Sequence, residues 1–293
     1  MTNEIQRAAI ALYDRFTHEG MDRRLFMRRL SRIAGGAAAA SALLGSIACH
    51  AQAAPQVAAD DRRVRGRTLE WEPRPGRRYR GYMVDPAGSR GTPPLVMVVH
   101  ENRGLNEHIR DVARRLAIAG FSALAPDFLS TSGGTPDNDE DRARTMIGAL
   151  DLGEIAADGA ATIQWHASPA GGSRKLGCVG FCWGGGLTDR LAVASGAALK
   201  AAVPFYGPAP PPADAPRVQA AMLIILAGLD NRVNATARPW AEALRAAGKD
   251  VTVHEFPNVD HAFHNDTSAA RYNQAAAQAA WAETLAFFRQ HLR

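Results

Sequence analysis

The chain has 293 residues, of which 46% are hydrophobic and 22% are charged, so it can bury one large core and is not a disordered chain. Its net charge of +5 comes mainly from the first 53 residues, because the remainder holds 27 basic and 25 acidic side chains. The remainder shows no dense basic stripe with interleaved aromatics, which argues against a nucleic-acid partner. Three cysteines (Cys49, Cys178 and Cys182) are too few for a disulfide scaffold.

Residues 1–53 are predicted to be a twin-arginine signal segment. Residues 22–28 contain two arginines, a spacer, a phenylalanine, an apolar residue and a basic residue, and residues 33–48 form a Gly/Ala-rich apolar run. Residues 51–53 supply small side chains at both positions that a signal peptidase reads, which predicts cleavage before Ala54. Twin-arginine export carries folded proteins. We therefore expect the export machinery as a partner during targeting and the periplasm as the final location.

Two alternatives stay open for this segment. An amphipathic N-terminal helix on a cytoplasmic protein also places basic residues beside apolar ones. A retained lipid anchor on Cys49 fits less well, because Ser46 occupies a position that usually has Leu or Val. The apolar run itself is too short and too rich in glycine to be a good membrane span.

Residues 54–76 are rich in Ala, Arg, Pro and Gly without lasting periodicity, which predicts a linker, and residues 77–293 are predicted to form one domain. In that domain strand-like and helix-like stretches alternate, which favours a mostly parallel sheet with helices on both faces. The predicted strands are 79–84, at the sheet edge, 94–100, 121–126, 176–181, 201–206, 221–227 and 251–256. The predicted helices are 106–119, 140–150, 155–166, one that begins at 183, 235–247 and 271–291.

Cys182 is the predicted nucleophile. It lies between an apolar strand and a helix in the run Gly180-Phe181-Cys182-Trp183-Gly184, which is the G-x-S-x-G elbow with Cys in place of Ser. Glycines on both sides avoid collisions around a strained turn. The free N–H groups at the start of the following helix should lower the pKa of the thiol and help to hold an oxyanion. The alternative is a structural cysteine at a Gly-rich turn, which is our expectation for Cys178 within the strand.

Asp230 and His261 are the predicted partners of the nucleophile. Each follows a predicted strand, and the order nucleophile, acid, histidine is the one this elbow requires. His261 would take the thiol proton, and Asp230 would fix the orientation of its ring. Asp260 and His264 are rival candidates for these two roles. His261 and His264 could instead bind a metal, but no thiol pair lies nearby, so we expect no metal and no cofactor.

These motifs resemble those of the dienelactone hydrolase family, in the α/β-hydrolase superfamily. The resemblance rests on the elbow around Cys182, on Asp230 after Ala-Gly-Leu, on His261 before Ala-Phe, and on His-Glu-Asn-Arg-Gly-Leu-Asn at residues 100–106. It covers roughly residues 77–292. It implies an α/β-hydrolase fold and the hydrolysis of an ester or lactone.

The resemblance also implies roles for residues that the chain alone leaves undefined. Glu101 would hold the resting nucleophile until substrate binds, and the backbone N–H groups of Trp183 and Asn102 would form the oxyanion hole. Arg103 and Tyr206 are candidate substrate-binding residues.

Family members that cleave dienelactones hold the substrate carboxylate with two arginines. Arg144 matches one of them, with Arg142 as a rival. The second position, four residues after His261, is Asn265 here, which makes a carboxylated dienelactone a less certain substrate.

The predicted function is that of a monomeric or weakly dimeric hydrolase that cleaves a small-molecule lactone or carboxylic ester through a Cys182 thioester. A general periplasmic carboxylesterase is the alternative within the hydrolases. Two readings from other classes remain: a thiol-redox protein that uses Cys178 and Cys182, and a binding module on a hydrolase scaffold.

Overall fold

The computed structural model of the protein describes residues 3–18, 21–48, 55–89 and 91–293. The predicted cleavage site and Cys49 lie outside these residues. The strands are β1 (Val64–Arg74), β2 (Arg77–Pro86), β3 (Leu95–Val99), β4 (Ser122–Pro126), β5 (Leu176–Phe181), β6 (Leu199–Phe205), β7 (Ala221–Ala227) and β8 (Val251–Phe256). The helices are α1 (Asn3–His18), α2 (Arg23–Ala34), α3 (Ala37–Ala48), α4 (Glu107–Ile118), α5 (Glu140–Gly148), α6 (Leu152–Ala167), α7 (Trp183–Ala194), α8 (Asn231–Ala246) and α9 (Gln274–His291).

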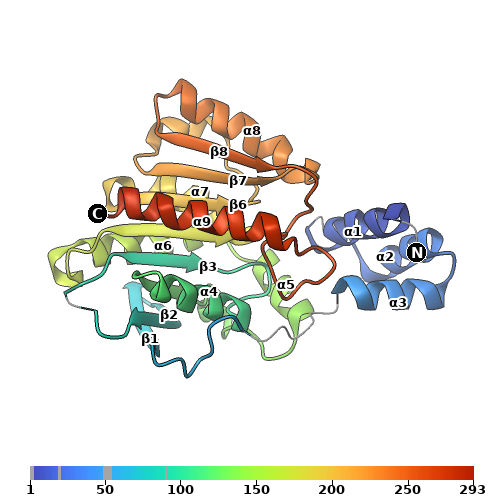
Figure 1. Ribbon diagram of the computed structural model, residues 1–293, viewed down its shortest axis with the longest axis horizontal. Coiled ribbons are helices and arrows are strands. Elements are labelled where there is room, and N and C mark those ends of the chain that lie inside the picture. Colours follow the sequence, from blue (N-terminus) through green and yellow to red (C-terminus); the bar gives the residue numbers. More distant parts are fainter. Residues whose placement is uncertain (1–2, 19–20, 49–54, 90) are drawn as a thin grey trace.

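The strands form one sheet in the order β1-β2-β4-β3-β5-β6-β7-β8 (Figure 1). Strands β3 to β8 run parallel, while β2 pairs antiparallel with both β1 and β4. The mostly parallel sheet that the sequence predicts is therefore confirmed. Because the carboxyl ends of β3, β5, β7 and β8 meet at one edge, residues far apart in the sequence come together there.

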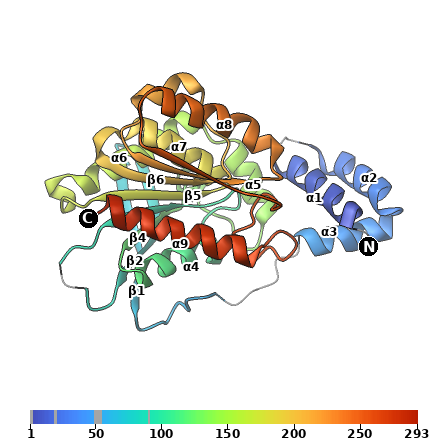
Figure 2. The same ribbon diagram turned by 45° about the horizontal axis from the view of Figure 1, so that its top comes forward.

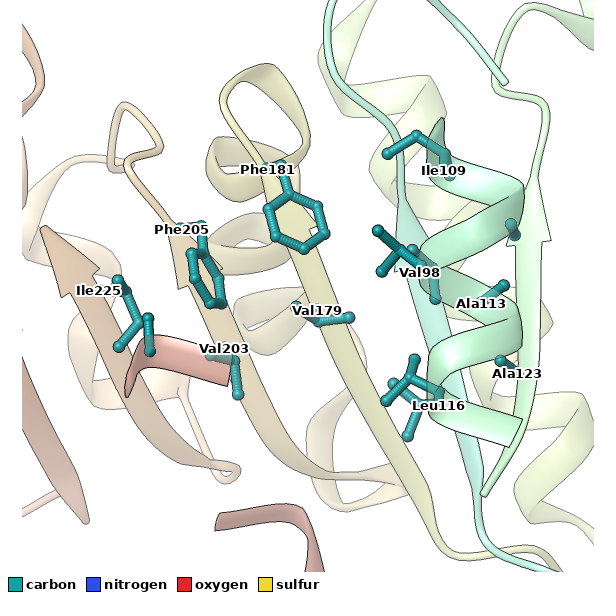
Figure 3. Packing of buried hydrophobic residues seen from close by; sticks show 14 of the residues in the cluster. Val98, Ile109, Ala113, Leu116, Ala123, Val179, Phe181, Val203, Phe205 and Ile225 are labelled. Carbon is teal, nitrogen blue, oxygen red and sulfur yellow. The ribbon is translucent and has the colours of Figure 1, made fainter. Parts of the chain in front are cut away.

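Helices cover both faces of the sheet (Figure 2). On one face, Ile109 and Leu116 of α4 and Phe288 of α9 pack against alternate strand residues such as Val179 and Val203. Figure 3 shows this packing between α4 and strands β3 to β7. On the other face, α6, α7 and α8 bury side chains that include Ile163, Leu191 and Trp240. Both faces of the central strands are thus buried, which explains their continuous apolar runs.

The predicted linker at residues 54–76 is wrong over residues 64–74, which form β1. This strand lies outside β2, so β2 is not the edge strand that the sequence predicts. Most β1 side chains are exposed or half-buried. An edge strand with one solvated face needs no apolar run, so arginines and glutamates hide its pattern. Its anchor is Trp71, whose ring nitrogen donates to Thr162 Oγ1 at 2.9 Å.

The predicted signal segment folds into helices α1, α2 and α3, which lie beside the carboxyl edge of the sheet (Figures 1 and 2). These helices bury a small core of their own that includes Phe26, Leu30 and Leu43. The apolar run contributes Leu43 and Ile47 to that core rather than standing alone. Across the described residues, none of the helices has the length and apolar character that crossing a membrane requires.

Asp158 of α6 ties β1 and β2 to the helical layer. Its fully buried carboxylate accepts hydrogen bonds from Arg74 at 2.6 Å and from Arg77 at 2.8 Å. The Tyr79 hydroxyl donates a further bond at 2.8 Å. Burial acts to raise the pKa of Asp158, but these three donors hold it below its usual value. The charged carboxylate therefore stabilises the fold above its unfolded pKa, and the stabilisation is lost as the pH falls through the folded pKa.

Replacing Asp158 with alanine should lower the free energy of unfolding by about 3 kcal/mol, because two arginines lose a buried counter-charge. Urea denaturation at neutral pH measures this change. The matched control is Asp214→Ala, which removes an exposed pair with Arg217 and should cost less than about 1 kcal/mol. Equal losses in the two variants would contradict the assigned role.

Candidate active site

The turn between β5 and α7 presents Cys182 with backbone angles of φ 59° and ψ −117°. Only small neighbours permit this turn: a Cβ on Gly180 would lie 2.1 Å from the Gly184 carbonyl oxygen, and one on Gly184 would lie 2.4 Å from the His100 carbonyl oxygen. The strained elbow expected from the sequence is therefore present. Cys182 is the N-cap residue of α7, which begins at Trp183, and only 4% of the Cys182 surface is exposed.

His261 and Asp230 meet at the same edge of the sheet. The ring nitrogen Nδ1 of His261 donates to Asp230 Oδ2 at 2.5 Å, and both residues are buried. Asp230 also caps α8, because its Oδ1 accepts from the Val233 N–H at 3.1 Å. The helix begins at Asn231 rather than at residue 235 as predicted, since this cap starts it directly after Asp230. One carboxylate thus fixes both the helix and the imidazole.

The charges of Cys182 and Asp230 determine the protonation of His261. Burial disfavours the imidazolium, but the charges of Cys182 and Asp230 and its hydrogen bonds to both raise the pKa of His261 to about 10. His261 in turn lowers the pKa of Asp230, against the effect of burial. The imidazolium form of His261 is therefore favoured at neutral pH, beside Cys182 and Asp230.

Glu101, directly after β3, adds a buried carboxylate to this cluster. Burial acts to raise its pKa, but the charge of Arg103 first, and then the electrostatic effects of His108 and Arg271, hold it below its usual value. Asn265 donates its side-chain amide to Glu101 Oε2 at 2.7 Å. Asn265 therefore orients a buried carboxylate from a position at which the family resemblance implies a substrate-binding arginine.

A cavity of about 10 Å³ lies among these side chains. It is lined by Tyr13, Thr17, Glu101, Asn102, Arg103, Cys182, His261, Ala262 and Arg271. Its lining includes four predicted site residues besides Cys182: Glu101, Asn102, Arg103 and His261. Arg103 is buried and pairs with Glu140, its Nε lying 3.5 Å from the carboxylate.

Three pocket residues were missed by the sequence analysis: Tyr13, Thr17 and Arg271. We predicted that the last helix would include Arg271, but α9 begins at Gln274, which leaves Arg271 in the preceding loop. An isolated arginine in a small-residue stretch gives no signal of its position. Tyr13 and Thr17 lie in α1, within the segment predicted to be removed.

Two candidate substrate-binding residues lie outside this cavity. Arg144 of α5 pairs with Asp141 at 2.7 Å and covers the ring of Phe16, so it lines a neighbouring hollow. Its rival Arg142 is exposed. Tyr206 is fully buried and packs its ring against that of His261 at 5.0 Å between centroids.

The rival residues have surroundings different from those of Cys182, Asp230 and His261. His264 stacks on Phe181, and burial lowers its pKa to about 3, so it stays neutral. Burial raises the pKa of Asp260, with the nearby Asp14 carboxylate adding to the shift. Cys178 is fully buried beside Thr188, and its pKa is raised to about 12, as expected of a structural cysteine.

The fold and this edge of the sheet define an α/β-hydrolase. Residues 79–292 match the dienelactone hydrolase family. A protein of Escherichia coli O157:H7 named "Putative carboxymethylenebutenolidase" is 33% identical over 234 residues, which cover 75% of this chain and 85% of that protein. The chain therefore belongs to the dienelactone hydrolase family, as the sequence motifs predict, and is a hydrolase.

Solved structures agree with this assignment. P91, a dienelactone hydrolase-like promiscuous phosphotriesterase from metagenomic libraries, is 26% identical with a TM-score of 0.69, covering 78% of this chain and 99% of its own. The dienelactone hydrolase of Anabaena variabilis ATCC 29413 has the same fold, with 23% identity and a TM-score of 0.63 over 79% of this chain and 100% of its own. The predicted α/β-hydrolase fold is thus confirmed.

Replacing Asp230 with asparagine should lower the pKa of His261 below its value of about 10, because one of the two negative charges that raise it is removed while Cys182 remains. Titration of the His261 ring nitrogens by NMR measures this shift without any substrate. Asp214→Asn, a change on the surface, serves as the control. An unchanged His261 titration in Asp230→Asn would contradict the assigned partnership.

Proposed function

We propose that this hydrolase cleaves a lactone or carboxylic ester through a thioester on Cys182. The observation that carries the proposal is the buried His261, hydrogen-bonded to Asp230 and charged by its contact with Cys182. A thiolate held beside an imidazolium is both a nucleophile and a ready proton donor. The substrate class follows from the relatives, since carboxymethylenebutenolidase and dienelactone hydrolase name lactone-opening activities.

In the proposed reaction the Cys182 sulfur bonds to the carbonyl carbon, and the carbonyl oxygen takes the negative charge. The N–H of Trp183, the first residue of α7, and that of Asn102 stabilise this oxyanion. When the carbon–oxygen bond breaks, the His261 imidazolium gives its proton to the departing oxygen. Neutral His261 then takes a proton from water, whose oxygen attacks the thioester, and the thiolate leaves again.

Binding of a carboxylate group on the substrate is a question separate from the hydrolysis of its ester bond. Asn265 is engaged with Glu101 at 2.7 Å, and Arg144 lies outside the catalytic cavity. Neither of the expected carboxylate positions therefore offers an arginine to the cavity. This observation favours a general carboxylesterase as the alternative, and rates on p-nitrophenyl acetate and carboxymethylenebutenolide separate the two.

Replacing Cys182 with alanine should lower kcat/KM on p-nitrophenyl acetate by at least about 10³-fold, because the covalent route is lost. The matched control is Cys178→Ala, which removes a buried thiol outside the site and should retain activity. Mass spectrometry of acid-quenched protein should find the acetyl group on Cys182. Equal activity of wild type and Cys182→Ala would reject the thioester mechanism, while loss in Cys178→Ala alone would favour a role for that thiol.

We further propose that the chain is exported through the twin-arginine route and works in the periplasm. Arg23 and Arg24 are exposed at the start of α2, and the pair of Arg23 with Asp141 is a surface ion pair that yields easily to another partner. Changing both arginines to lysine should leave the protein in the cytoplasmic fraction, as immunoblots of fractionated cells would show. Changing Arg7 and Arg15 to lysine is the control. Unaltered export of the first variant would contradict the proposal.

A further inference from the structure

We propose that helices α1 to α3 form an intramolecular cap that closes the catalytic cavity and keeps Cys182 out of reach of substrate. Figures 1 and 2 show these helices beside the carboxyl edge of the sheet, next to the loop that joins β8 to α9. That loop carries both His261 and Arg271. Helix α1 therefore contacts the same loop, between Phe256 and Gln274, that carries His261.

The first support is the size of the cavity. Tyr13 and Thr17 of α1 line it together with Cys182 and His261, and about 10 Å³ remains between them. This is close to the minimum that one water molecule needs, and far below the few hundred Å³ of an ordinary small-molecule site. A substrate carbonyl cannot reach the sulfur while α1 is in place.

The second support is an ion pair between the cap and the site. Arg271 Nη1 donates to Asp14 Oδ1 at 3.1 Å, and the Arg271 side chain is only 4% exposed. The ring of Tyr13 covers the same guanidinium at 5.6 Å from its centroid. Arg271 lines the catalytic cavity, so α1 places a carboxylate and an aromatic ring on a cation of the active site. A charge-assisted bond to a buried arginine gives the cap a specific docking position.

The third support is a hydrogen bond between α1 and Asn102, another residue that lines the cavity. The side-chain amide of Asn102 donates to the Thr17 carbonyl at 3.3 Å. Asn102 is the residue whose backbone N–H is proposed to hold the oxyanion, so the end of α1 is attached to that loop as well. In the neighbouring hollow, the Arg144 guanidinium covers the Phe16 ring at 5.4 Å from its centroid. The C-terminal part of α1, from Tyr13 to Thr17, is therefore held against the site.

The cap is built so that it can leave without unfolding the catalytic domain. Its buried residues pack against one another in a separate core, and among the described residues of the catalytic domain Ala270 is the hydrophobic residue packed against that core. The bonds that join it to the site are polar. When the cap leaves, water replaces Asp14 around Arg271 and replaces the Thr17 carbonyl at Asn102, so no apolar core is opened.

The full chain with Asp14→Arg tests the cap, because it places a second cation against Arg271. Alkylation of Cys182 by iodoacetamide, followed by peptide mass spectrometry, should become at least about tenfold faster than in wild type, since repulsion shifts the equilibrium towards the open state. Hydrolysis of p-nitrophenyl acetate should rise in parallel. Asp14→Asn, a milder change that keeps the side-chain shape, should give a smaller increase in both.

The matched control is Glu4→Arg, the same reversal of charge at an exposed position of α1 away from the cavity, which should leave both rates unchanged. Cys178, fully buried in β5, reports unfolding, so it should stay unlabelled in every variant. Labelling of Cys182 at the wild-type rate in both Asp14 variants would overturn the cap. This inference uses the proposed function only for its second readout: faster labelling without any ester hydrolysis would support the cap and count against the hydrolytic mechanism.

Discussion

The hydrogen bond between Asp230 and His261 is the interaction on which the chemistry of this site depends. Alone, a buried imidazole loses its charge, as His264 does three residues later. His261 keeps its charge because Asp230 and Cys182 supply negative charge in a place that water barely reaches. In a medium of low dielectric constant such pairing is strong, and so is the penalty for an unpaired member. Asp230 and His261 therefore each influence the ionisation of the other.

The backbone makes this pairing possible. Cys182 occupies a left-handed conformation that a non-glycine residue adopts only under constraint, and the constraint comes from the close approach of β5, α7 and the end of β3. Asp230 is held from the other side, because it caps α8 while bonding the imidazole. The parallel sheet gathers these residues at one edge, so the geometry follows from the topology rather than from any single loop.

Much of this arrangement could be predicted because the constraint leaves traces in the sequence. The glycines beside Cys182 are required by backbone contacts, and the apolar run before Asp230 is required by two-sided burial, so both are visible in the residues alone. The edge strand β1 could not be predicted in this way, because a solvated face tolerates arginine and glutamate at most positions.

Contacts between distant segments leave no such trace. The residues around Asn265 in the sequence do not indicate that its side chain orients Glu101. The residues around Arg271 do not indicate that its counter-charge, Asp14, lies 257 positions earlier in the chain. Tyr13 and Thr17 were assigned to a segment whose only expected role was targeting. Such contacts depend on which surfaces the completed fold brings together. A sequence pattern reflects only what each helix or strand requires for its own formation and burial.

The N-terminal helices connect targeting with catalysis under the two proposals made above. A chain that folds before export carries its signal on the outside, and here the exposed arginines of α2 and the cavity-lining face of α1 belong to the same small helical unit. The same unit that would be recognised for transport thus covers the reactive thiolate. Polar contacts suit this purpose better than a continuous apolar interface would, because their loss costs little once water can replace them. Under the two proposals, a site closed by an aspartate on an arginine would be protected before export and would open without any rearrangement of the sheet that positions Cys182, His261 and Asp230.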